Sequence, residues 1–172
     1  MANGKAHKKI NLIFLAIGIG AVLISSQYYV HGISVILGYL FGTYCMNPDL
    51  DIRSHPYRRW GFLRFIWIPY QKLKHRSIWT HGYVIGDLIR YLYLMFWILV
   101  GMGVISILTD VPYSTYSKDL RELFIQHKLS ILSFIVGNML SSTAHILTDH
   151  ASTTFKKINK WIKSLYFCNV NK

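Results

Sequence analysis

Residues 129–149, LSILSFIVGNMLSSTAHILTD, carry the pattern that decides the fold. The apolar run over 129–147 is long enough to cross a bilayer as one helix. Its polar residues recur at steps of four, three and four, which places them in one stripe along one helix face: Asn138, Ser142, His145 and Asp149. Because polar groups are costly in lipid, we expect this stripe to face other helices.

Three further apolar runs precede this one, over residues 10–24, 33–46 and 84–108. The third has spanning length, and its Asp87 and Arg90 lie three apart on one helix face, where they can pair. The first two are short, since fifteen residues cover about 22 Å of a hydrocarbon core of about 30 Å. These two helices either borrow flanking residues or form a hairpin that does not fully cross.

The composition favours a membrane protein of the all-α class. Hydrophobic residues make up 52% and charged residues 15%, against roughly 25% charged residues in an ordinary soluble domain. We therefore expect a single domain over 1–172 with about four transmembrane or membrane-embedded helices and a basic loop between the second and third. The expected helices cover about 8–28, 32–47, 82–108 and 128–150, followed by a basic tail over 156–172.

The distribution of Lys and Arg predicts the orientation. The chain has 19 Lys+Arg against 7 Asp+Glu, a net charge of +12, and the surplus lies before the first run, in residues 53–76 and in the tail. Residues 25–32 hold no Lys or Arg, and 110–128 are close to neutral. Four spans with both termini cytoplasmic agree with this pattern. We expect membrane lipids as partners and no nucleic acid.

The basic loop also contains aromatic residues, which has two interpretations. Trp60, Trp67 and Tyr70 among arginines are typical of the lipid headgroup level. In the alternative, an arginine of this segment binds a phosphate of the substrate, the candidates being Arg58, Arg59 and Arg76. The two cysteines, Cys45 and Cys168, form no Cys-x-x-Cys pair, so neither a disulfide framework nor a thiolate zinc site is expected.

Candidate metal ligands gather at the predicted cytoplasmic ends of the helices. They are two aspartates after a proline, two histidines before the third run, the i, i+4 pair on the fourth and one N-terminal histidine: Asp49, Asp51, His75, His81, His145, Asp149 and His7. Solvated helix-capping aspartates, surface histidines and a metal-free His–Asp hydrogen bond are the alternatives. The other histidines, His31, His55, His127 and His150, are left out of the ligand set.

Mixed imidazole and carboxylate ligands suit Zn²⁺ first, with Mn²⁺ or Fe as alternatives. Seven ligands are too many for one tetrahedral zinc. A site for two metals about 3.5–4 Å apart is therefore also considered.

Several motifs together resemble a known family. They are NGKAH over 3–7, NPDLD over 47–51, YRRWG over 57–61, WIPY over 67–70, HRS over 75–77, THG over 80–82 and the late His145/Asp149 pair. The set resembles an uncharacterised family of metal-binding proteins that looks related to the membrane-bound metal-dependent hydrolases of the LexA-binding, inner-membrane-associated type. The resemblance covers nearly the whole chain and is weakest over 110–128 and the tail. It implies a ligand set of His7, Asp49, Asp51, His81, His145 and Asp149, with His75 as an additional member.

The leading functional hypothesis is metal-dependent hydrolysis of a phosphoester or lipid-like substrate at the cytoplasmic face. Water activated by the metal would be the nucleophile, and Asp51 would be the catalytic base. The alternative is a non-enzymatic membrane subunit or scaffold with a structural metal. Cation transport is weaker, because it would require ionisable groups near the bilayer midplane.

Overall fold

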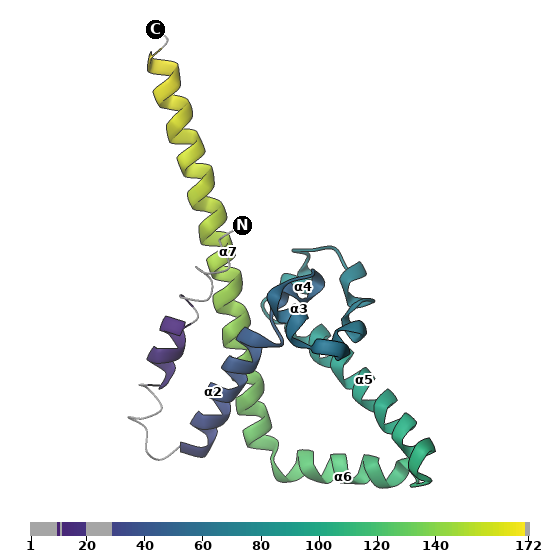
Figure 1. Ribbon diagram of the computed structural model, residues 1–172. Helices are drawn as coiled ribbons and strands as arrows, with labels where there is room; N and C mark the ends of the chain where they lie inside the picture. The colour runs from purple at the N-terminus through teal and green to yellow at the C-terminus, as the bar shows by residue number, and fades with distance from the viewer. Residues whose placement is uncertain (1–9, 11, 20–28, 171–172) are drawn as a thin grey trace.

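The computed structural model describes residues 10, 12–19 and 29–170, and its regular elements there are all helices (Figure 1). The long ones are α2 (Tyr29–Tyr44), α5 (Ile85–Thr109), α6 (Tyr113–Gln126) and α7 (Lys128–Val170). Short α-helices and 3₁₀ turns fill the segment between α2 and α5: η2 (Pro48–Asp51), α3 (His55–Arg59), η3 (Gly61–Trp67), η4 (Tyr70–Lys72) and α4 (Ile78–His81). The prediction of an all-α chain is confirmed.

Helix α2 packs along the N-terminal half of α7, and glycines set how closely (Figure 1). A Cβ atom added at Gly38 would lie 1.9 Å from the carbonyl oxygen of Phe134, and one at Gly137 would lie 2.0 Å from that of Val35. The two backbones therefore touch. The polar stripe of α7 is buried from Asn138 through Asp149, so the expectation that it faces inward is confirmed.

Helices α5 and α7 are the two that are long and apolar enough to cross a membrane among the residues described. The apolar stretches are Ile85–Thr109 and Lys128–Ile162. No residue in the most apolar window of α5 is buried within the chain. Helix α2 has 16 residues, about 24 Å, and the first apolar run lies partly outside the described residues. The prediction of four spans stays a prediction.

The structure has helix in two stretches where the sequence analysis expected none. Residues 110–128 were expected to be a loop, but α6 forms there because its apolar residues recur at helical spacing, as at Tyr113, Tyr116, Leu120 and Leu123. Helix α7 continues through the basic tail to Val170, since no Gly or Pro follows Gly137 in that stretch to end it.

The basic segment between α2 and α5 is not an open loop, because it folds around a small hydrophobic core of its own. Trp67 is fully buried at its centre, and the cluster contains Met46, Leu50, Tyr57, Ile66, Trp67 and Tyr70. Trp60 donates its indole N–H to the carbonyl of Cys45 at 3.0 Å, which ties this core to the end of α2. For Trp67 and Tyr70 the expectation of a position among lipid headgroups is wrong, because both side chains are inside the protein.

Candidate metal centre

The turn η2 places two carboxylates at the end of α2. Asn47 caps the turn, since its side-chain Oδ1 accepts a hydrogen bond from the Asp49 backbone N–H at 3.0 Å. Pro48 follows at the first position, where a missing N–H costs nothing. The Asp51 side chain is fully buried, whereas that of Asp49 is 21% exposed. Both lie on the side of η2 that faces α4.

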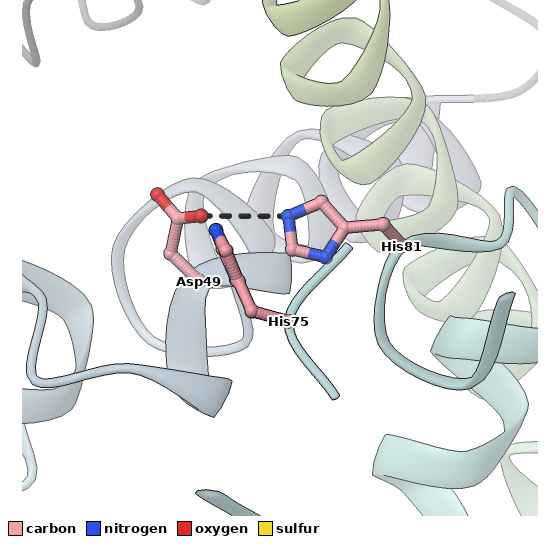
Figure 2. Close-up of side chains that lie close together, drawn as sticks. All are labelled: Asp49, His75 and His81. Atoms are coloured by element: carbon pink, nitrogen blue, oxygen red, sulfur yellow. Dashed lines mark ion pairs between the residues drawn. The ribbon is translucent and has the colours of Figure 1, made fainter. Parts of the chain in front are cut away.

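Helix α4 and the turn before it bring two histidines to these carboxylates. His75 Nδ1 lies 2.9 Å from each carboxylate oxygen of Asp51. His81 Nδ1 lies 3.6 Å from Asp51 Oδ2, and its other nitrogen, Nε2, lies 3.5 Å from Asp49 Oδ1. Figure 2 shows the His81 ring facing Asp49 with the His75 ring beside them. Asp51 therefore lies on the Nδ1 side of both imidazoles.

Helix α7 completes the cluster with His145. Its Nε2 lies 3.4 Å from Asp49 Oδ1, so the same oxygen faces two imidazole nitrogens from different elements. Four residues further along the same helix, Asp149 accepts a hydrogen bond from Arg76 Nη2 at 2.6 Å. Two sets of three ligand atoms lie within 4.8 Å of one another, and His81 belongs to both: Asp49, His75 and His81, and His81, His145 and Asp149.

The distances in this cluster fit a metal ion. Asp49 Oδ1 and His81 Nε2 are buried, and neither is in hydrogen-bond geometry with another residue that the structure describes. Ligand bonds of about 2.05 Å in a tetrahedron would place neighbouring ligand atoms about 3.3 Å apart. The observed separations of 3.4 and 3.5 Å are close to that value. A cation bound there would thus satisfy Asp49 Oδ1 and His81 Nε2, with His145 Nε2 as a further ligand beside them.

The electrostatics keep Asp49 ionised. Burial works to raise the pKa of this carboxyl, but the imidazoles of His145 and His81 outweigh burial and hold the pKa well below its usual range. A carboxylate that remains charged at neutral pH is ready to bind a cation.

A buried polar network beneath the cluster holds His81 in place. Arg90 donates to the carbonyl of Thr80 at 2.8 Å and to the carboxylate of Asp87, as its position three residues later predicted. Asp87 also accepts from Ser142 at 2.7 Å, which links α5 to α7. The Thr80 hydroxyl lies 3.1 Å from His81 Nδ1. The network therefore connects two helices to the backbone that carries His81.

Five of the predicted ligands are brought together by the structure: Asp49, His75, His81, His145 and Asp149. Asp51 lies beside this group, on the Nδ1 side of His75 and His81. Its predicted roles as ligand and base stay predictions. His7 lies outside the described residues. The histidines left out of the set, His31, His55, His127 and His150, belong to neither group of ligand atoms.

Sequence reasoning predicted the Arg90–Asp87 pair but missed how Asn47, Thr80 and Arg90 support the site. Asn47 Nδ2 lies 3.5 Å from His145 Nδ1, and the Asn-Pro pair before two aspartates is the signal that could have identified it as a cap. No local pattern indicates that Arg90 reaches Thr80, because that contact depends on how α4 folds back onto α5.

The chain also matches known sequences. Residues 2–159 match the profile of the family described as "Uncharacterized metal-binding protein (DUF2227)". A curated relative from Aquifex aeolicus (strain VF5), described as an uncharacterized protein, is 35% identical over 135 residues, covering 70% of this chain and 91% of the relative. No solved structure matches the chain significantly.

Proposed function

Since the chain belongs to this family of uncharacterised metal-binding proteins, we propose that it is a membrane-bound hydrolase that uses a divalent cation. Its substrate is a phosphoester or a lipid-like molecule at the cytoplasmic face. The observation that carries the proposal is that Asp49 Oδ1 lies 3.5 Å from His81 Nε2 and 3.4 Å from His145 Nε2. Zn²⁺ is the first choice for these ligands, because they are nitrogen and oxygen atoms with no thiolate; Mn²⁺ and Fe are alternatives.

Asp51 is better suited to orienting ligands than to proton transfer. Its carboxylate is buried on the Nδ1 side of His75 and His81, so that their Nε2 atoms are left for the cation. Metal-binding imidazoles commonly donate their second N–H to a carboxylate, as the 2.9 Å contact between His75 Nδ1 and Asp51 allows. We therefore assign Asp51 a positioning role in place of the base expected from the sequence.

Asp149 is the carboxylate that we propose as the general base. It lines a cavity beside the cluster, which neither Asp49 nor Asp51 does. When bound, the cation would polarise the phosphoryl oxygens and lower the pKa of water. Asp149 would accept a proton from that water once its hydrogen bond with Arg76 is broken.

The membrane arrangement that we propose has α5 and α7 as spans. The metal cluster lies near the start of α5. Helix α6 connects the C-terminal end of α5 to the N-terminal end of α7, on the side away from the cluster (Figure 1). The basic segment over 53–76 lies at the cluster end, which supports a cytoplasmic position for that end. Both termini are cytoplasmic in this proposal.

The test combines metal analysis with a substrate panel. Purified protein should contain metal stoichiometrically and hydrolyse a member of a phosphoester and lipid panel, and Asp49→Ala or His145→Ala should abolish both properties. His127→Ala is the matched control, because His127 is exposed and outside the cluster. Stoichiometric metal without turnover of any panel member would refute the hydrolase.

A structural metal is the second candidate function. The ligand atoms come from η2, from α4 with its preceding turn and from α7, so one cation would connect segments far apart in the sequence. In that case Asp49→Ala would lower the thermal midpoint of unfolding, and there would be no activity to lose.

A further inference from the structure

A cavity of about 580 Å³ opens beside the metal cluster, between α4, the start of α5 and α7. Its lining includes the polar side chains of Arg76, His81 and Asp149. It also includes four apolar side chains, called the apolar wall below: Ile78, Val84, Ile85 and Ile146. The volume is within the usual range for sites that bind small molecules. A lining that holds both polar and apolar side chains can contact both parts of an amphiphile.

Arg76 is the charged group suited to an anion in this cavity. It has a left-handed backbone with φ of 60°, a conformation that is unusual for a residue with a side chain and that is found more often at functional sites. Its side chain is 38% exposed and donates from Nη2 to Asp149. It is the sole Lys or Arg among the described residues that line the cavity, which suits one phosphate group rather than a polyphosphate.

The apolar wall is open on its outer side. Ile78 is 58% exposed and Val84 59% exposed, although both are large apolar side chains. They continue into the apolar surface of α5, whose most apolar stretch is not buried within the chain. If α5 spans the membrane, as proposed above, this wall faces the lipid. An apolar chain could then enter from the bilayer without first passing through water.

We propose that the cavity binds a phosphate monoester that carries a single apolar chain. This inference rests on the hydrolase proposal and specifies its substrate class. Arg76 exchanges Asp149 for the phosphate, which places the phosphorus beside His81 and releases Asp149. Water then adds to phosphorus, the P–O bond to the chain breaks, and the chain leaves as an alcohol that has taken up one proton from the water. The other product is inorganic phosphate.

Binding can be tested separately from turnover with octylphosphonate, which has no ester bond to hydrolyse. Zinc-loaded protein in detergent is titrated with octylphosphonate, ethylphosphonate and octanol. Arg76→Gln should weaken octylphosphonate binding roughly 10- to 100-fold, the loss expected for a charge-assisted pair, and should leave octanol binding unchanged. Arg64→Gln, an exposed arginine outside the cavity, should change neither.

The apolar wall has a separate test in the same titration. Val84→Ser should weaken octylphosphonate binding several-fold and leave ethylphosphonate unchanged, because the shorter ligand does not reach the wall. Arg76→Lys provides a second variant if Arg76→Gln proves unstable; it keeps the charge but loses the planar fork and should bind octylphosphonate with intermediate strength. Circular dichroism checks that each variant is folded.

Each outcome distinguishes the two proposals. Unchanged octylphosphonate binding in folded Arg76→Gln, or equal effects of Val84→Ser on both phosphonates, would overturn the inference about the cavity. If the wild type binds octylphosphonate as expected but does not hydrolyse octyl phosphate or any panel substrate, the hydrolase fails while the binding site stands. Turnover of octyl phosphate that survives Arg76→Gln unchanged would leave the hydrolase standing and remove this assignment.

Discussion

Replacing Asp51 by Asn should weaken metal binding without removing a ligand from the cluster. The carboxylate accepts from His75 at 2.9 Å, and His81 Nδ1 lies 3.6 Å from it, too far for a hydrogen bond. A hydrogen bond to a charged partner contributes about 1.5–3 kcal/mol, and a neutral amide oxygen retains about half of that. We therefore expect a loss of about 0.75–1.5 kcal/mol at His75, or roughly 3- to 13-fold in metal affinity.

The assay is a competition titration of zinc against a chromophoric chelator, carried out on purified protein at neutral pH. Asp119→Asn is the matched control, because Asp119 is exposed on α6 and should leave the affinity unchanged. The positioning role would be refuted by an unchanged zinc affinity in Asp51→Asn. A loss of turnover at unchanged affinity would restore Asp51 as the catalytic base, as the sequence alone suggested.

Three further predictions concern the packing and the metal. Gly38→Ala should lower the free energy of unfolding by about 1–3 kcal/mol, since its Cβ would meet the Phe134 carbonyl at 1.9 Å, whereas Gly18→Ala, with nothing within 4 Å, should not; equal effects in denaturant titrations would contradict the close packing. Arg90→Met should cost about 3–5 kcal/mol by leaving Asp87 buried without its partner, and adding Asp87→Leu should recover part of that loss; a double variant as unstable as the single one would argue against the pair. A chelator should lower the thermal midpoint of the wild type and leave that of Asp49→Ala unchanged, because binding to the native state stabilises it; no shift in the wild type would contradict a bound metal.

The sequence predicted what depends on spacing along one helix. The stripe on α7 follows from a 3.6-residue period, and its burial agrees with the cost of polar groups in lipid. The Asp87–Arg90 pair likewise follows from a separation of three residues. Such patterns are local, so a single chain is enough to reveal them.

The sequence could not predict how residues from different elements face one another. His145 and Asp149 share a helix face, yet one lies against Asp49 and the other pairs with Arg76. Asp49 and Asp51 are two residues apart, but one lies on the Nε2 side of His81 and the other on the Nδ1 side. These differences arise from the packing of η2, α4 and α7. Trp67 was also misjudged, because a tryptophan in a basic segment has the same local signature at a membrane surface and in a small core.

The central claim is that Asp49, His81 and His145 hold one divalent cation. Its most direct measurement is the metal content of purified protein by mass spectrometry, for the wild type and for His145→Ala, with His127→Ala as control. We predict at least one equivalent of zinc, or of manganese or iron, in the wild type and in His127→Ala, and a substoichiometric amount in His145→Ala. Equal metal content in the wild type and His145→Ala, or no bound metal in the wild type after incubation with zinc, would contradict the claim.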